Sequence, residues 1–122
     1  MVTPMMRFLS LAAAVLLAAS PAWAHAFLQH STPPVGSASS VAPPAVAISF
    51  TEAIEPAFST IEVHAADGAA VQAGTPHLAP GNARQLIVDL PKLPPGIYTV
   101  IWHATSVDTH KTSGRFEFTV TP

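Results

Sequence analysis

Three residues have the types and spacing to bind a metal ion: His25 and, far from it in the sequence, Asp108 and His110. If the chain is cut just before His25, this residue offers its α-amine and an imidazole nitrogen, which together can close one chelate ring on Cu(II) or Zn(II). Asp108 and His110 are two residues apart, so both side chains point to the same side of an extended segment. Three nitrogens and one oxygen fit the tetragonal preference of Cu(II) better than a structural zinc site, which typically contains cysteines.

The first 24 residues have the features of an export signal. Arg7 precedes an apolar run at residues 9–19, and the segment ends in Ala-Trp-Ala. The run is shorter than the roughly 20 apolar residues that a membrane-spanning helix needs. We therefore expect cleavage after Ala24, which would make His25 the first residue of a mature protein that is periplasmic and not embedded in the membrane.

The composition after residue 24 argues against several classes of function. Four basic residues stand against seven acidic ones, which gives a net charge of −3. Lys and Arg do not cluster, so nucleic acid is disfavoured as a partner. There is no cysteine, and the three methionines are at positions 1, 5 and 6. The mature chain therefore lacks the thiolate and thioether ligands that select Cu(I).

Alternation of apolar and polar residues predicts short β-strands after residue 24. Strands are expected at residues 46–50, 60–64, 85–90, 96–104 and 115–121, with a short edge strand near 26–29 and a weaker strand near 70–73. Residues 74–83 contain Thr-Pro and Ala-Pro-Gly and are predicted to form a loop. The strands at 96–104 and 115–121 are expected to pair antiparallel, so that the loop at 105–114 carries Asp108 and His110.

About seven short strands without helical periodicity predict an all-β fold, either an immunoglobulin-like β-sandwich or a small Greek-key barrel. The 98 residues after the signal suffice for one small domain with a single core. We therefore expect a signal peptide at 1–24, one metal-binding domain at 25–122, and a monomer. Tyr98 and Trp102 are expected to lie in the core.

Three stretches of the sequence resemble the CopC family of exported copper-binding proteins. They are HAFLQHSTPPVGS from His25, AVAISFTEAI from Ala45, and LPPGIYTVIWHATSVDTHKTSGRFEFTV from Leu93. The resemblance covers nearly all of residues 25–121. It includes the family's terminal G-x-Y-x-V-x-W-x-x-x-S-x-D-x-H-x-x-x-G block in full.

The resemblance implies that the mature chain binds one Cu(II) ion through the amine and imidazole of His25, the imidazole of His110 and the carboxylate of Asp108. It also implies that Glu52 lies near this site, as a weak ligand or as a hydrogen-bond acceptor. Some family members carry a methionine-rich Cu(I) site, which this sequence lacks, so a Cu(II)-only version is expected. The implied role is a periplasmic carrier or buffer in copper homeostasis and resistance, not an enzyme, which passes copper to an inner-membrane transporter of the CopD type.

The residues alone also allow two other functions. An N-terminal His with a second His forms the copper brace of polysaccharide monooxygenases, which would make the chain an oxidative enzyme. A β-sandwich without metal would instead serve as an interaction module. Hydroxyl groups of Thr105, Ser106 and Thr109 are expected to donate hydrogen bonds that orient Asp108 or His110. The other histidines are expected to have surface or hydrogen-bonding roles: His30, His64, His77 and His103.

Overall fold

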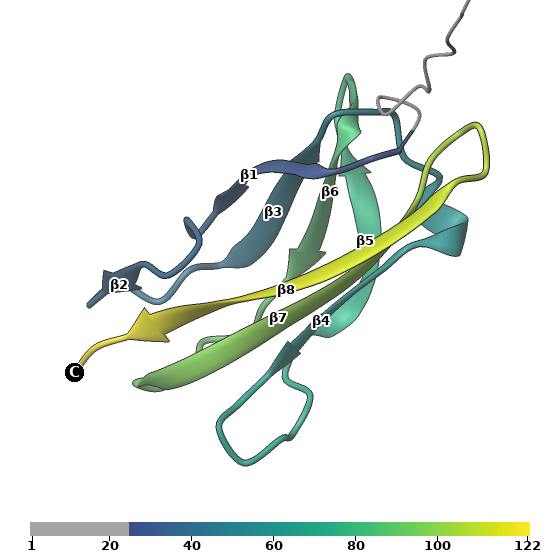
Figure 1. Ribbon diagram of the computed structural model, residues 1–122. Coiled ribbons are helices and arrows are strands. Elements are labelled where there is room, and N and C mark those ends of the chain that lie inside the picture. The colour runs from purple at the N-terminus through teal and green to yellow at the C-terminus, as the bar shows by residue number, and fades with distance from the viewer. Residues whose placement is uncertain (1–24) are drawn as a thin grey trace, which may run out of the picture.

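The computed structural model describes residues 25–122, which form eight β-strands and one short 3₁₀-helix, Pro56–Phe58. The strands build two four-stranded sheets that lie face to face (Figure 1). Sheet A has the order β1 (Leu28–Thr32), β3 (Ala45–Phe50), β6 (Asn82–Asp89), β5 (Ala73–Ala79). Sheet B has the order β2 (Ala38–Ser39), β8 (Lys111–Val120), β7 (Gly96–Thr105), β4 (Thr60–His64). The predicted all-β sandwich is confirmed, whereas the predicted signal peptide at 1–24 lies outside the described residues.

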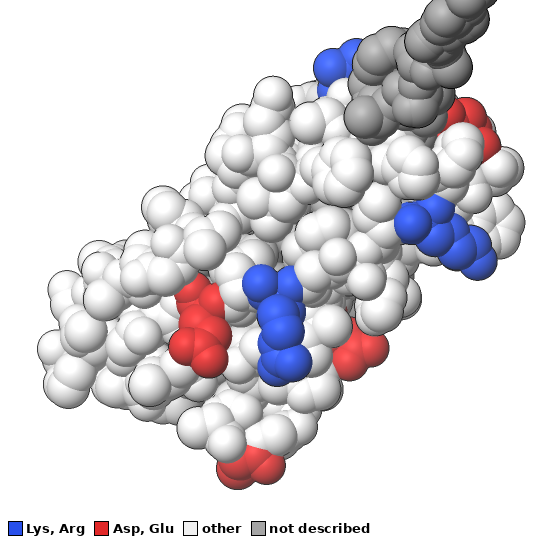
Figure 2. Space-filling view, in the orientation of Figure 1, with Lys and Arg blue, Asp and Glu red and all other residues white. Residues whose placement is uncertain are grey.

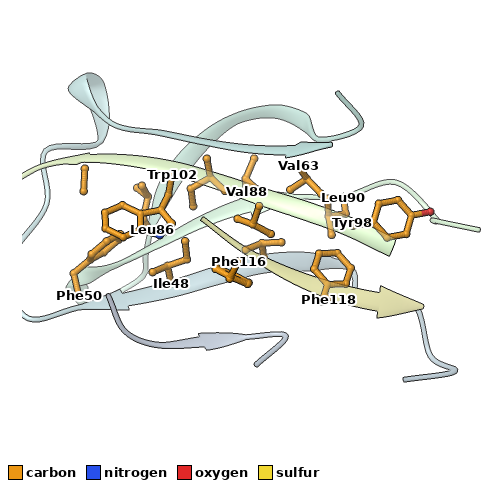
Figure 3. Packing of buried hydrophobic residues seen from close by; sticks show 14 of the residues in the cluster. Ile48, Phe50, Val63, Leu86, Val88, Leu90, Tyr98, Trp102, Phe116 and Phe118 are labelled. Carbon is orange, nitrogen blue, oxygen red and sulfur yellow. The ribbon is translucent and has the colours of Figure 1, made fainter. Parts of the chain in front are cut away.

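One hydrophobic core fills the space between the sheets (Figure 3). Every second residue is buried in β3, in β7 from Tyr98 onward and in β8 from Phe116 onward, as the alternating sequence pattern predicts, because successive side chains of a strand point to opposite faces. Tyr98 stacks on Phe118 with ring centroids 5.4 Å apart, and Phe50 meets Trp102 edge to face at 5.2 Å. Tyr98 and Trp102 are therefore core aromatics, as expected.

The pairing of β7 with β8 is the longest in the fold and confirms the predicted antiparallel pair. Its register runs without interruption from Gly96 opposite Val120 to Thr105 opposite Lys111. Strand β8 begins at Lys111, four residues earlier than predicted. The connecting loop is therefore only residues 106–110, and His110 lies directly before a regular strand instead of inside a long loop.

The prediction of a loop at residues 74–83 is wrong. Strands β5 and β6 form an antiparallel hairpin there, with Pro80 and Gly81 at its turn and Gly81 at φ 71°. A proline followed by a glycine with positive φ is typical of a type II turn. Strand β5 tolerates Pro76 because it is an edge strand, and the register shifts between Ala73 and His77. His77, which was expected in a loop, lies on this strand.

Smaller differences concern the first strand and the connection after it. Strand β1 covers Leu28–Thr32, so the predicted strand at 26–29 begins and ends too early. The two-residue strand β2, parallel to β8, was not predicted. The predicted weak strand at 70–73 reduces to a single bridge between Ala70 and His64 before β5 begins at Ala73.

Surface charge is sparse on the face of the molecule shown in Figure 2, where basic and acidic side chains alternate instead of gathering in one patch. Within residues 25–122, the structure contains no helix long and apolar enough to cross a membrane.

Candidate metal centre

The loop between β7 and β8 is a tight turn fixed by backbone hydrogen bonds. The Thr109 amide donates to the Ser106 carbonyl at 2.8 Å, and the Ser106 amide donates to the His110 carbonyl at 2.9 Å. Thr109 has φ 76°, a left-handed conformation that closes the turn. The turn thereby brings Asp108 and His110 side by side at the end of the sandwich.

Residues 53–55, which follow β3, are hydrogen-bonded to this loop and to the end of β7. The Val107 amide donates to the Ala53 carbonyl at 3.0 Å, and the Glu55 amide donates to the Thr105 carbonyl at 2.8 Å. Ile54 also forms a bridge with Ser106. The loop that joins β7 and β8 of sheet B is therefore tied to the segment that leaves β3 of sheet A.

Asp108 and His110 contact each other directly. His110 Nδ1 lies 3.2 Å from Asp108 Oδ1, and both side chains are about half exposed, at 47% and 46%. The Ser106 hydroxyl donates a hydrogen bond to the same carboxylate oxygen. The hydrogen bond from Ser106, followed by that from His110, holds the pKa of Asp108 below its ordinary value. The carboxylate is therefore ionised and oriented, which suits either a metal ligand or a partner for a ligating imidazole.

His25 lies against His110 although 84 residues separate them in the sequence. Their ring centroids are 4.7 Å apart with planes inclined by 40°. The His25 ring is also stacked on Phe27, with ring centroids 6.1 Å apart and planes inclined by 25°. His25 precedes β1 in sheet A and His110 precedes β8 in sheet B, so the contact between the two imidazoles lies where these two strands begin.

Glu52 occupies the same end of the sandwich, two residues after β3, and is half-buried. Its neighbour in sequence, Thr51, is hydrogen-bonded to residues 25–27, the segment that carries His25. Among residues 25–122, however, no three His, Asp or Glu side chains form a ready-made cluster with metal-site spacing. The structure thus brings together His25 with His110 and His110 with Asp108, as two contacting pairs.

The other histidines lie on the strands. His30 is exposed on β1 opposite Ser49, and His103 is exposed on β7. His64 Nε2 lies 2.8 Å from Glu62 Oε1, and His77 Nε2 lies 3.5 Å from Asp89 Oδ1.

Of the three hydroxyl residues expected to orient the site, Ser106 contacts the Asp108 carboxylate. The Thr105 hydroxyl instead donates to the Phe58 carbonyl at 2.8 Å, and the Thr109 hydroxyl donates to the backbone carbonyl of Asp108. Sequence reasoning missed Thr51 and Thr112, whose hydroxyls contact residues 25–27. Thr51 directly precedes Glu52 and Thr112 follows His110 by two residues, but these positions alone do not indicate which backbone atoms the hydroxyls contact.

Residues 28–121 match the CopC domain. The chain belongs to the CopC family. Among its relatives, Protein YobA of Escherichia coli strain K12 is 37% identical over 99 residues, which cover 80% of each chain. The crystal structure of CopC from Methylosinus trichosporium OB3b is 32% identical, with a TM-score of 0.75 over 80% of this chain and 95% of that one. The family resemblance seen in the sequence is thereby confirmed.

A further CopC-family structure is that of PcoC, a methionine-rich copper resistance protein from Escherichia coli. It is 28% identical to this chain, with a TM-score of 0.69 over 78% of this chain and 97% of that one. This chain departs from that methionine-rich protein in composition, since no methionine follows Met6. Any metal site in residues 25–122 of this CopC protein must therefore be built from nitrogen and oxygen ligands.

Proposed function

We propose that this CopC protein is exported, is cleaved after Ala24 and binds one Cu(II) ion as a periplasmic carrier or buffer in copper homeostasis. The observation that supports this most directly is the contact between the His25 and His110 rings, together with the contact between His110 and the Asp108 carboxylate. Two imidazoles, a carboxylate and a new α-amine make a nitrogen-rich set of the kind Cu(II) prefers.

The proposed ligands are the amine and imidazole of His25, the imidazole of His110 and the carboxylate of Asp108. Glu52 is proposed as a weak fifth ligand or as an acceptor beside them. In the uncut chain the backbone nitrogen of His25 is an amide, which is a much poorer ligand than an amine. Cleavage therefore completes the site as well as releasing the mature protein.

Binding without turnover fits the same ligand set. A redox cycle would require Cu(I) to be held as well, and nitrogen and oxygen ligands hold it less well than sulfur. We therefore propose a transfer role, in which the ion passes to an inner-membrane transporter of the CopD type. The half-exposed positions of His110 and Asp108 would leave the ion accessible to such an acceptor.

Electron paramagnetic resonance of the Cu(II)-loaded, processed protein tests the ligand set. We expect nitrogen hyperfine structure that changes in His25→Ala and in His110→Ala, together with a loss of Cu(II) affinity of at least about 10-fold. His64→Ala, on β4 and away from the site, is the matched control. It should leave the hyperfine structure and the Cu(II) affinity unchanged. A protein that keeps one extra methionine before His25 should bind weakly; equal affinity with and without that residue would refute the proposal.

A further inference from the structure

Residues 25–27 precede the first strand, because β1 begins only at Leu28. The ends of a chain are usually poorly ordered unless other groups tie them down. A ligand on a mobile terminus would lose conformational entropy on binding the metal, and affinity would fall accordingly. The bonds that hold these three residues therefore bear directly on the site.

Thr51, directly after β3, contacts this segment three times. Its hydroxyl accepts a hydrogen bond from the Phe27 amide at 3.0 Å and donates one to the His25 carbonyl at 3.3 Å. Its own amide donates to the Phe27 carbonyl at 3.0 Å. One threonine thus extends the pairing of β1 with β3 past the end of both strands.

Thr112 holds the same segment from the opposite sheet. Its hydroxyl donates to the Ala26 carbonyl, at 2.5 Å, from a position on β8 two residues after His110. Between the two threonines, the Ala26 side chain is fully buried in the core. The backbone on both sides of the His25–Ala26 peptide is therefore fixed relative to sheets A and B together.

We propose that Thr51 and Thr112, here called the threonine clamp, are positioning residues that hold the mature N-terminus so that the His25 amine and imidazole face His110. This inference rests on the proposed function. The clamp touches only backbone atoms of residues 25–27, so it leaves every nitrogen of the His25 amine and ring free for the metal. It also links His25 to β8, the strand that His110 precedes.

Valine substitution tests the clamp, because Val keeps the shape of Thr but removes the hydroxyl. In the processed protein we expect Thr51→Val and Thr112→Val each to weaken Cu(II) binding about 10-fold, and the double variant about 100-fold, within the range seen for residues that orient ligands. Nitrogen hyperfine structure should change at the same time. Thr51→Ser and Thr112→Ser keep the hydroxyl and should retain wild-type Cu(II) affinity and hyperfine structure. Thr99→Val, in the middle of sheet B, is the matched control.

A thermodynamic cycle separates positioning from general damage. In the His25→Ala background there is no His25 side chain to position, so the valine variants should change the residual Cu(II) affinity much less than in the wild type. Equal losses in both backgrounds would overturn the proposal, as would wild-type affinity and spectra in both single variants.

If the double variant fails to fold, as judged by circular dichroism, the affinities and spectra of the single valine and serine variants test the clamp. Unchanged binding in His25→Ala and His110→Ala would overturn the proposed function and the clamp together, whereas loss in those variants with normal binding in the valine variants would overturn the clamp alone.

Discussion

The two ring nitrogens of His110 have different surroundings. Nδ1 faces the Asp108 carboxylate at 3.2 Å. In a neutral imidazole, a proton held on Nδ1 by a carboxylate leaves the lone pair on Nε2, the arrangement commonly found in metal-binding histidines. This contact therefore orients the His110 ring and would leave Nε2 as the nitrogen available to the proposed ion.

Ser106 controls the state of Asp108, so Ser106→Ala should raise the pKa of the Asp108 carboxyl towards its ordinary value of 3.8. The reason is that the hydroxyl hydrogen bond favours the ionised form and is the largest cause of the lowered pKa. NMR titration of the metal-free protein measures this shift, with Ser113→Ala on β8 as the control.

The sign of the pH dependence follows from the lowered pKa. A carboxyl whose folded-state pKa is depressed stabilises the fold above its ordinary pKa, and this contribution disappears as the pH falls through the folded value. Acid should therefore loosen the loop at 106–110 below the ordinary carboxyl range, and Ser106→Ala should make this happen at a higher pH. An unchanged Asp108 titration in Ser106→Ala would contradict the role assigned to the hydroxyl.

At the scale of elements, the sequence pattern predicted the strands that bury one face in the core. It did not predict strands in which buried and exposed residues do not alternate. Strands β7 and β8 carry large aromatic residues at inward positions that alternate with outward ones, namely Tyr98, Trp102, Phe116 and Phe118, which is a strong pattern. Strand β5 has no fully buried residue and contains a proline, so no periodic signal distinguishes it from a loop. The Pro80-Gly81 pair was the usable signal, because it marks a turn between two strands.

The β7–β8 pair depends on Gly114, since a β-carbon there would lie 2.5 Å from Cζ2 of Trp102. Gly114 is opposite Trp102 in the register, and the indole lies over the glycine. Gly114→Ala must displace a rigid ring that packs on Phe50, so we expect it to destabilise the protein by about 1–3 kcal/mol. Urea unfolding followed by fluorescence measures this loss, and Trp102 is the only tryptophan after residue 24.

Gly96→Ala provides the matched control on the paired strand. Its β-carbon would meet Tyr98 at 3.7 Å, which is ordinary van der Waals contact. We therefore expect a smaller change in the free energy of unfolding than in Gly114→Ala. Equal stability of the two alanine variants would show that the indole moves aside without cost.

At the scale of the whole molecule, the candidate site lies where the two sheets end, and this explains how far sequence reasoning reached. The spacing of Asp108 and His110 is local and could be read directly. The approach of His25 to His110 depends on which strands end at the same side of the sandwich, and only the family resemblance supplied that information. Thr51 and Thr112 were missed because their bonds go to backbone atoms, which leave no pattern in the sequence.

A ligand that bridges the two sheets should stabilise the whole fold. His25 is bonded to sheet A through Thr51, and His110 directly precedes β8 of sheet B. A metal bound by both residues can keep its full ligand set only in the native state, and binding that favours the native state raises the free energy of unfolding. At a free Cu(II) concentration about 100 times Kd, this gain is about 2.7 kcal/mol, which corresponds to a rise in Tm of roughly 10–20 °C for a domain of this size.

Thermal unfolding of the processed protein, with Cu(II) and after its removal by EDTA, measures this gain. We expect a large rise in Tm for the wild type and a small one for His110→Ala. In that variant, the amine and imidazole of His25 remain together on one residue, so they bind copper in the unfolded chain as well as in the folded one, and binding to both states cancels in the stability. The rise in Tm that remains in His110→Ala therefore measures the stabilisation that Cu(II) provides without the His110 imidazole. A rise as large as that of the wild type would mean that copper does not connect the two sheets.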